Sequence, residues 1–551
     1  MKIQARRKIF TRIILISFFL FQGGIAAQTK DVFIPNNSRQ VIHGTVKDEN
    51  GNPLLAQVQL WYYPLKPIKF STKNDERKDN LISMTYTTDK GFYNVRVPSD
   101  TVVLIISKGP EWSIIKKKFI INKREFNGIE FNATLNHIYD LSSIGLYAGD
   151  PHHHSIFSDA YETPTEIARA MRSVGLSWGI LSDHNSDEGI SEWLSCKSPD
   201  FIPIHGCEIT TEPTEISKEN GYGHLNESFI KRINGTKVND PNIWARARFS
   251  SHQDVQDMIN MVHAQKGFIA LNHPFQSWDW SGRFKSWGKV KDFDAIEVWN
   301  GEPPHGITMN DWDTNHININ TWGVHSWFEY LNAGNKLSAI AGSDCHDIYG
   351  VNAYPKCDAY WTTTTGNPRT YVYASELSEE NIQKAMKGGK AFLTSNFGPL
   401  LLIDVEGKIP GEVVKVKEDG KINIKLKVMA NQPLLKTNSG LRIIFNGKII
   451  SEIETDTVYT ISKDISLSPG KDGWIVVEAF GQWPMYSITN PIYIDYPPYG
   501  DNIKSSWTDP KGVESWNNFL SHPQLKLPDG TSNWKDTADS IKNRDKLVQK
   551  N

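Results

Sequence analysis

Residues 149–185 read GDPHHHSIFSDAYETPTEIARAMRSVGLSWGILSDHN and carry the clearest folding signal in the chain. Thr163 suits a helix N-cap, Pro164 suits the first helical position, and Glu166 completes a capping box. The apolar residues that follow recur at helical spacing: Ile167, Ala170, Met171 and Val174. Gly175 suits the helix end, and the apolar run 178–181 is typical of a buried strand. The stretch therefore predicts a helix followed by a strand.

This alternation of helical and apolar segments continues over residues 140–398. A second helix is expected to begin near Ser251 and to end at Gly267, before a strand at 268–271. Its apolar face is formed by Val255, Met258, Ile259 and Val262. Further apolar runs follow at 295–298, 328–331 and 337–341. We therefore expect residues 140–398 to form an α/β domain with parallel strands, arranged as a distorted TIM-like β/α barrel.

The segments on either side of this region have the pattern of β-structure. Residues 40–137 contain runs of alternating polarity at 43–46 and 58–61, separated by a turn signal at 48–53. Residues 399–495 contain apolar runs at 422–428, 441–445 and 474–479. With 551 residues the chain is long enough for several domains, and we expect an all-β sandwich on each side of the α/β domain. Residues 496–551 read as a polar tail.

The first 27 residues have the features of a secretory signal peptide. A basic segment precedes the short apolar run 13–21, and small residues end at Ala26 and Ala27. We therefore expect residues 1–27 to be removed and the chain to be periplasmic or extracellular. The mature chain has no apolar segment long enough to span a bilayer. The formal net charge of −2 gives no reason to expect nucleic acid as a partner.

Histidines and carboxylates cluster in the α/β region. Fourteen of the sixteen histidines fall between residues 137 and 346. Candidate ligands follow five successive predicted strands, whose carboxyl ends converge on one face of a parallel barrel. These candidates are Asp150, His152, His154, Asp183, His184, Glu208, His273, Asp344 and His346. The sequence therefore predicts one metal centre assembled from distant segments.

The donor types favour transition metals in this centre. Neutral imidazole and carboxylate suit Zn²⁺, Mn²⁺ or Fe²⁺, and there are more donors than one ion needs. We therefore expect two or three divalent ions, with Glu208 as a candidate bridge. The remaining histidines read as structural: His137, His205, His252, His263, His305, His316 and His325. His153 alternates with His152 and His154 and is expected to point away from the centre.

The quoted stretch resembles the first motif region of the PHP (polymerase and histidinol phosphatase) superfamily. The later segments GCEIT, GHLN, LNHPF, IEVWNG and AGSDCHD resemble the motifs that follow it, in the same order. The combination is similar to the carbaryl-hydrolase-like (CehA/McbA) branch, in which an exported PHP domain carries β modules. The N-terminal segments GTVKDENGNPLLAQVQL and TTDKGFYNVRVP resemble the carboxypeptidase-regulatory-like β-sandwich. Such modules are accessory, so this second resemblance implies a scaffold.

The PHP resemblance implies a role for each matching residue. It implies one metal held by His152, His154, Glu208 and Asp344, and a second that Glu208 shares with His224 and His273. It places Asp159, His184 and His346 on the remaining side, where they would hold a third ion or orient the substrate. These last three are the candidate catalytic residues, and Asp183 and Glu297 are expected to support the ligands from behind.

An insertion rich in tryptophan follows His273 and is expected to roof the centre. Its aromatic faces could stack on a sugar, base or aryl group, and Arg283 could hold a phosphate. The candidate substrate-binding residues are Trp280, Arg283 and Asn300. The alternative is that the tryptophans pack into a small core of their own.

Three functions are compatible with these residues. The leading hypothesis is an exported metal-dependent phosphoesterase, in which metal-activated hydroxide attacks phosphorus and His184 or His346 assists the leaving group. The second keeps the centre but cleaves a carboxylic ester, carbamate or amide. The third is a glycan- or partner-binding surface protein with a structural metal cluster. The expected partner of the first two is a small ester that contains a phosphate, sugar or aryl group.

Overall fold

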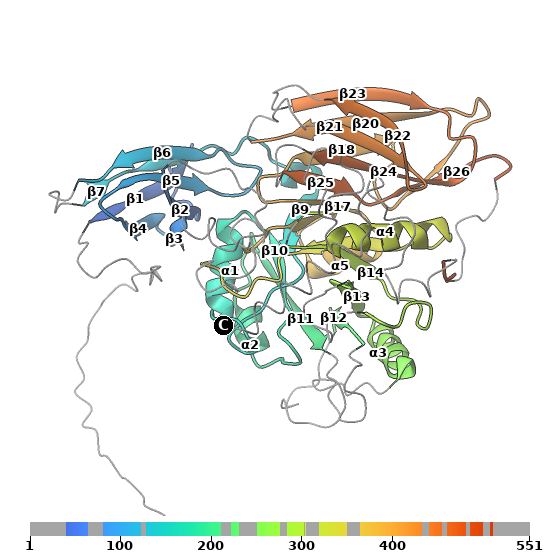
Figure 1. Ribbon diagram of the computed structural model, residues 1–551, viewed down its shortest axis with the longest axis horizontal. Coiled ribbons are helices and arrows are strands. Elements are labelled where there is room, and N and C mark those ends of the chain that lie inside the picture. The colour runs from blue at the N-terminus through green and yellow to red at the C-terminus, as the bar shows by residue number, and fades with distance from the viewer. Residues whose placement is uncertain are drawn as a thin grey trace, which may run out of the picture.

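The computed structural model describes residues 40–63, 81–122, 128–210, 222–230, 251–275, 284–301, 303–304, 319–349, 364–431, 440–454, 460–480, 485–499 and 507–510. It is a mixed α/β protein with several sheets, some of them antiparallel. The N-terminal sheets lie beside the central α/β part, and the C-terminal strands lie over it (Figure 1). The predicted signal peptide 1–27 and most of the tail 496–551 lie outside the described residues.

The first helix forms where the sequence predicts it. Helix α1 spans Pro164–Ser173, and the side chain of Thr163 accepts from the backbone N–H of Glu166. The Glu166 carboxylate in turn accepts from the backbone N–H of Thr163 at 2.9 Å, which completes the capping box. The helix buries its apolar stripe against strand β10 (Trp178–Leu181) and short helix α2 (Ile190–Ser195). Helix α3 (His252–Ala264) begins at the Ser251 cap and is followed by β13 (Phe268–Asn272), also as predicted.

The central sheet departs from the all-parallel barrel. Its strands run in the order β15-β14-β13-β12-β11-β10-β9. Strands β9, β10 and β11 pair in parallel, as do β13, β14 and β15, but β12 is antiparallel to both of its neighbours. The bounds not yet given are β9 (Leu146–Asp150), β11 (Ile202–Thr210), β12 (His224–Ser228), β14 (Ala295–Asn300), helix α4 (Ile319–Asn332) and β15 (Ser338–Gly342). The expectation of parallel strands over residues 140–398 is therefore wrong at β12, and it is also wrong at β16 (Arg369–Tyr373) and β17 (Ala391–Thr394), which pair antiparallel.

The two ends of this curved set of strands meet just beyond their carboxyl termini. The backbone N–H of Asp344, after β15, donates to the carbonyl of His152, after β9, at 2.9 Å. His154 N–H donates to the Cys345 carbonyl at 3.2 Å, and His153 and Cys345 form an isolated parallel bridge. The barrel-like closure is thus made by the segments that carry candidate ligands.

The N-terminal part contains two four-stranded sheets. One contains β4-β1-β7 with β8 paired to β1, and the other has the order β3-β2-β5-β6. Their strands are β1 (Val41–Asp48), β2 (Gln57–Tyr62), β3 (Leu81–Tyr86), β4 (Phe92–Arg96), β5 (Thr101–Ser107), β6 (Ile115–Ile120), β7 (Ile129–Glu130) and β8 (Ala133–Leu135). Apolar side chains from both sheets form one cluster between them. A short 3-10 turn, Ser142–Ile144, leads from here to β9.

The C-terminal strands continue the central sheet. β16 (Arg369–Tyr373) pairs with β9 and with β17 (Ala391–Thr394), and β17 pairs with β25 (Tyr486–Thr489). A separate three-stranded sheet has the order β18-β20-β23. The other elements are α5 (Glu379–Lys387), β18 (Leu400–Val405), β19 (Val413–Lys415), β20 (Ile422–Met429), β21 (Gly440–Phe445), β22 (Lys448–Glu454), β23 (Thr460–Leu467), β24 (Gly473–Phe480) and β26 (Ile492–Asp495). The sheet thus runs across the predicted boundary near residue 398.

Within the described residues, every helix is too short or too polar to cross a membrane.

We expect Thr163→Ala to lower the free energy of unfolding by about 1 kcal/mol, because it removes the oxygen that caps α1. Urea denaturation measures this change. Thr134→Ala, at an exposed position on β8, is the matched control and should change stability by less than about 0.5 kcal/mol. Equal effects of the two substitutions would show that the capping box does not stabilise the helix.

Candidate metal centre

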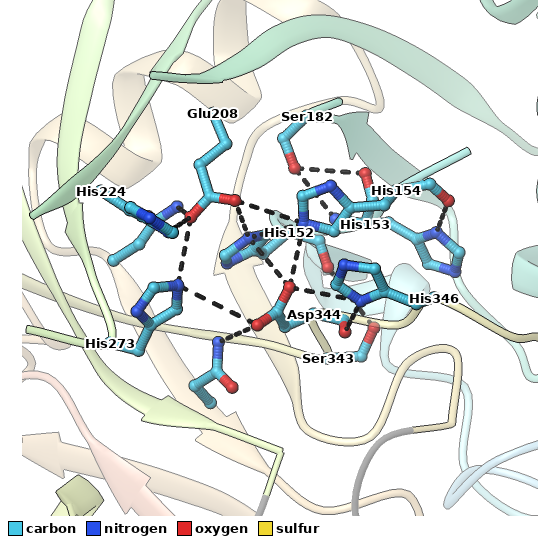
Figure 2. A network of polar contacts seen from close by, with 12 residues as sticks. His152, His153, His154, Ser182, Glu208, His224, His273, Ser343, Asp344 and His346 are labelled. Atoms are coloured by element: carbon cyan, nitrogen blue, oxygen red, sulfur yellow. Dashed lines mark hydrogen bonds and ion pairs between the residues drawn. The ribbon is translucent and has the colours of Figure 1, made fainter. Parts of the chain in front are cut away.

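The candidate ligands gather at one edge of the central sheet. His152 and His154 follow β9, His184 follows β10, His273 follows β13, and Asp344 follows β15. Glu208 lies near the end of β11, and His346 is close behind Asp344. Figure 2 shows most of these side chains pointing toward one another. The sequence-predicted convergence of strand ends is therefore present in the structure.

His224 joins this group because β12 runs in the opposite direction. It is the first residue of β12 and pairs across the sheet with Thr210 at the end of β11 and Asn272 at the end of β13. The amino end of an antiparallel strand lies at the same edge as the carboxyl ends of its parallel neighbours. A histidine that follows no strand in the sequence therefore faces the centre.

Four donors form what we call the inner group: His152, His154, Glu208 and Asp344. The Nε2 atom of His152 lies 3.2 Å from His154 Nε2 and 3.3 Å from both Glu208 Oε2 and Asp344 Oδ1. His154 Nε2 lies 3.3 Å from Glu208 Oε2 and 2.9 Å from Asp344 Oδ1. Ligand atoms around a tetrahedral ion with bonds of about 2.0–2.1 Å lie about 3.3–3.4 Å apart. The inner group therefore has nearly the spacing that one metal ion requires.

Glu208 directs its two carboxylate oxygens to different donors. Oε2 faces the inner group, whereas Oε1 lies 3.1 Å from His224 Nδ1 and 3.1 Å from His273 Nε2. Asn272 Nδ2 donates to the same Oε1 at 2.8 Å and helps to fix the carboxylate. A carboxylate with donors on both sides is suited to bridge two ions, as the sequence predicts for Glu208.

A second set of four donors, three of them partly exposed, forms what we call the outer group: His154, Asp159, His184 and His346. Asp159 Oδ1 lies 3.1 Å from His346 Nε2, and its Oδ2 lies 3.7 Å from His184 Nε2. The Asp159 side chain is 44% exposed and that of His184 is 24% exposed, whereas His152, His154 and Glu208 are at 0%. The centre therefore opens to solvent on the side of the three candidate catalytic residues.

Glu297 supports two of the histidines from behind. Its Oε1 lies 2.9 Å from His152 Nδ1, and its Oε2 accepts from the backbone N–H of His273 at 2.9 Å. A proton on His152 Nδ1 leaves the Nε2 lone pair free to face the inner group. Gly342 makes this packing possible, because an added Cβ would lie 2.5 Å from His152 Cβ and 2.7 Å from Glu297 Oε1.

Asn300 was assigned to substrate binding from the sequence, but its side chain is engaged with the centre's carboxylates. Its Nδ2 donates to Glu297 Oε2 at 3.0 Å and to Asp344 Oδ2 at 3.2 Å. The Asn300 side chain is thus placed to support Asp344. The backbone of Asp344 adopts the left-handed conformation, with φ 51°.

Asp183 contacts a turn and not a histidine ring. Its carboxylate accepts from the backbone N–H of Ser155 at 2.6 Å, from the Ser155 hydroxyl at 2.6 Å and from the Ser158 hydroxyl at 2.7 Å. These bonds hold the segment between His154 and Asp159, so Asp183 acts on the ligands through the backbone. Asp183 thus lies where a support for the ligands is expected, and its contacts are with the turn that carries them.

Asp150 is buried, joins two backbone segments by hydrogen bonds, and lies outside the ligand groups. Its carboxylate accepts from the backbone N–H of Ser343, the Ser343 hydroxyl and the Gly366 N–H. Burial raises its pKa to about 6, although the hydrogen bonds to Ser343 and Gly366 oppose the rise. It ties the end of β9 to the segment after β15.

Two further supports were not identified from the sequence. Thr210 Oγ1 lies 2.5 Å from His184 Nδ1, and the Thr210 backbone is held by the Asn185 side chain at 3.1 Å. Asn272 holds Glu208, as described above. Thr210 is the last residue of β11 and Asn272 is the last residue of β13, and this position at a strand end is the signal that could have identified them.

Other predicted features fall outside the centre. His153 points away from it, with Nε2 3.1 Å from Thr365 Oγ1, as strand alternation predicts. His263, in the last turn of α3, pairs with Asp294, as expected of a structural histidine. The described tryptophans of the insertion are buried in an apolar cluster, which favours the packing alternative: Trp287, Trp299, Trp322 and Trp327. The candidate substrate residues Trp280 and Arg283 lie outside the described residues.

In the metal-free chain, shifts in pKa leave some of the ligands charged and others neutral. Burial alone would raise the pKa of Glu208, but the rings of His152 and His184 bring it well below its usual range. Burial also opposes charge on His346, yet Asp159 and Asp344 raise its pKa to about 9. Burial lowers the pKa of His154 to about 3, so this ring is neutral and ready to donate a lone pair. The carboxylates are thus negatively charged and would attract bound cations.

The residues fit a metal cluster. Among the described residues no hydrogen bond is made to four buried atoms, namely Glu208 Oε2, His154 Nδ1, His224 Nε2 and His273 Nδ1. Glu208 Oε2 nevertheless lies 3.1–3.3 Å from three histidine nitrogens, so the atoms converge without the geometry of a hydrogen bond. Buried polar atoms in proteins nearly always have a partner. Bound cations would supply it here, and the adjoining inner and outer groups suit more than one ion.

Comparison with known proteins gives only distant likenesses. No protein-family model and no curated protein matches the chain. It is similar to a two-domain protein from Bacteroides vulgatus that contains a predicted PHP-like metal-dependent phosphoesterase. That likeness has 17% identity and a TM-score of 0.33, and it covers 63% of this chain and 94% of the other. An amidohydrolase from Chromobacterium violaceum with bound sulfate is similar at 15% identity and a TM-score of 0.22, over 36% of this chain and 87% of the other. We therefore base the function on this chain's own residues.

We expect metal binding to release protons between pH 6.5 and 9. In this window the raised pKa of about 9 keeps His346 protonated in the metal-free chain, and a ligand must give up that proton. Apparent metal affinity should therefore rise with pH and level off above about 9. Titration of metal-depleted protein in weak buffer measures the protons, and His346→Gln should release fewer. Identical proton release from both proteins would exclude His346 as a ligand.

We expect Glu297→Gln to weaken metal binding by about 10–100-fold, because the amide no longer holds His152 in one tautomer. A competition titration with a chelator measures the affinity. Glu188→Gln, at an exposed position in the loop after His184, is the matched control and should bind metal normally. Unchanged affinity in Glu297→Gln would mean that Glu297 does not set the tautomer of His152.

Proposed function

We propose that this chain is a metal-dependent hydrolase and that its substrate is a phosphate ester. The observation that carries the proposal is the inner group, in which His152 and His154 lie 2.9–3.3 Å from each other and from the carboxylates of Glu208 and Asp344. The outer group adjoins it through His154 and faces solvent. A buried cluster beside a solvent-exposed one is the arrangement expected of a catalytic centre, because a structural site is closed by its ligands.

Charge favours an anionic substrate. The two groups contain three carboxylates, from Asp159, Glu208 and Asp344. Two or three divalent ions would outweigh these charges and leave a positive field at the open side. A phosphate ester carries the matching negative charge, whereas a carboxylic ester or carbamate is neutral. Bound divalent ions would supply activation of water and neutralisation of charge on the ester oxygens.

The protein's own residues would position the reaction. Glu297 and Asn300 fix His152 and Asp344, and Thr210 fixes His184, so the donors are held before substrate arrives. We propose that Asp159, His184 and His346 contact the substrate, because they line the side that solvent reaches. A histidine there can give a proton to the leaving oxygen.

Two finer assignments belong to the same proposal. The combination of the PHP-like motifs with flanking β segments supports the carbaryl-hydrolase-like branch of the PHP superfamily, and the sequence of residues 1–27 supports export to the periplasm or the medium. We propose both, together with a carboxypeptidase-regulatory-like identity for residues 40–137. Fractionation of cells that express the tagged full chain tests the location, and cell-retained protein would contradict it.

We expect the purified mature chain to contain two or three divalent ions and to hydrolyse phosphate esters. Glu208→Ala should lose both properties together, because it removes the carboxylate shared by the two sides of the centre. Metal analysis and a panel of phosphomonoesters and phosphodiesters measure this, with aryl esters and carbamates alongside. His263→Gln removes a histidine outside the centre and should keep full metal content and activity.

The panel separates the alternatives. Turnover of carboxylic esters or carbamates alone would preserve the metal centre and overturn the phosphoesterase assignment. Full metal content without turnover of any ester, together with loss of thermal stability on chelation, would favour a structural cluster.

A further inference from the structure

The last residue of strand β3 leaves the N-terminal sandwich and packs into the α/β part. All six residues of β3 are buried. Ile82 belongs to the apolar cluster between the two N-terminal sheets, but Tyr86 belongs to a different cluster that includes Leu146, Cys345 and Ile348. A side chain from the N-terminal sandwich thus lies behind the metal centre.

Tyr86 contacts the segment that carries two candidate ligands. We call residues 343–349 the ligand loop, since it contains Asp344 and His346. The Tyr86 hydroxyl donates to the backbone carbonyl of Ile348 at 2.6 Å. The Tyr86 ring also lies 6.0 Å from that of Tyr349 at an interplanar angle of 49°. The contact therefore combines a short buried hydrogen bond with an aromatic pair.

The ligand loop is fixed at its other points by the α/β part. Asp344 N–H donates to the His152 carbonyl at 2.9 Å, and the His346 carbonyl accepts from Tyr161 N–H at 3.2 Å. Ile348 N–H donates to the Glu162 carboxylate at 3.2 Å. Tyr86 thus holds the carboxyl end of the loop, two residues beyond His346.

The loop needs such support because its conformation is strained. Asp344 has φ 51°, in the left-handed region that residues with a side chain rarely adopt. Such a conformation persists only when the surroundings hold it. Loss of the Tyr86 hydroxyl would also leave the buried Ile348 carbonyl without this hydrogen-bond donor. Because an unpaired buried carbonyl is unfavourable, the loop would tend to rearrange until the carbonyl has a donor again.

We propose that Tyr86 is a positioning residue for the metal centre, so that the N-terminal sandwich is part of the metal-binding unit. It acts through the ligand loop on Asp344 and His346 and does not touch metal or substrate. This inference rests on the proposed metal centre, but it does not depend on which ester is cleaved. It also goes beyond the scaffold role that the sequence resemblance implies for the sandwich.

Tyr86→Phe tests the proposal because it removes the hydroxyl alone. The sandwich stays docked through other contacts, since Lys108 Nζ donates to the Arg172 carbonyl at 2.5 Å and Tyr371 donates to Glu111 at 2.9 Å. Tyr93→Phe is the matched control. Tyr93 is also buried, and its hydroxyl also donates to one backbone carbonyl, that of Phe131, at 2.7 Å, but it lies inside the sandwich core.

The readouts are amide hydrogen exchange of the ligand loop and metal affinity measured against a chelator. For Tyr86→Phe we expect faster exchange confined to residues 343–349 and a metal affinity about tenfold lower. Tyr93→Phe should leave both at the wild-type level, although both variants lose one buried hydrogen bond. Wild-type exchange and affinity in Tyr86→Phe, or equal changes in both variants, would overturn the proposal.

A second variant keeps the test decisive if Tyr86→Phe does not fold. Tyr349→Leu removes the aromatic pair from the side of the loop and leaves the Tyr86 hydrogen bond in place. It should raise loop exchange and lower metal affinity by a smaller factor, and unchanged values would overturn the proposal. Neither readout uses hydrolysis, so an inactive wild-type protein that binds metal would refute the phosphoesterase assignment and leave the role of Tyr86 testable.

Discussion

The buried carboxylate of Glu208 imposes the constraint on which this structure depends. A charged carboxylate removed from water is strongly unfavourable unless positive charge and hydrogen bonds surround it. Here five histidine nitrogens lie 3.1–3.3 Å from its two oxygens, and Asn272 donates to one of these oxygens. These partners come from the ends of different strands. The sheet must therefore bring those ends to one point, and any bound ion must lie where they meet.

This constraint explains which features of the centre could be predicted from the sequence. Helix α1 was predictable because its cap and apolar stripe are local signals, and His152, His154 and Asp344 were predictable because they follow apolar strands. The direction of β12 was not, because strand pairing is decided by contacts between distant residues. His224 lies at the ligand edge because it is the first residue of an antiparallel strand. A search for ligands that follow a strand therefore does not find it.

The same reason limits the prediction of domain organisation. Alternating runs identify the flanking strands correctly, but not the sheet that each strand joins. β16 and β17 connect the C-terminal strands to β9, so hydrogen bonds continue from the ligand-bearing strands into the C-terminal part. On the other side, Tyr86 and Lys108 reach from the N-terminal sheets to the ligand loop and to the end of α1. Separate modules in the sequence are thus joined around one centre.

Burial divides the centre into a part that is fixed and a part that is free to react. Three of the inner donors are fully buried and Asp344 is largely buried, and Glu297, Asn300 and Asn272 hold the inner donors in place. The outer donors are partly exposed, and Asp159 sits on a turn whose conformation depends on Asp183. Rigid support would hold an ion in place, while an ion held by the partly exposed donors would keep a position open to solvent and substrate. Because His154 belongs to both groups, the packing that fixes an ion in the inner group would also fix where the open side of the centre begins.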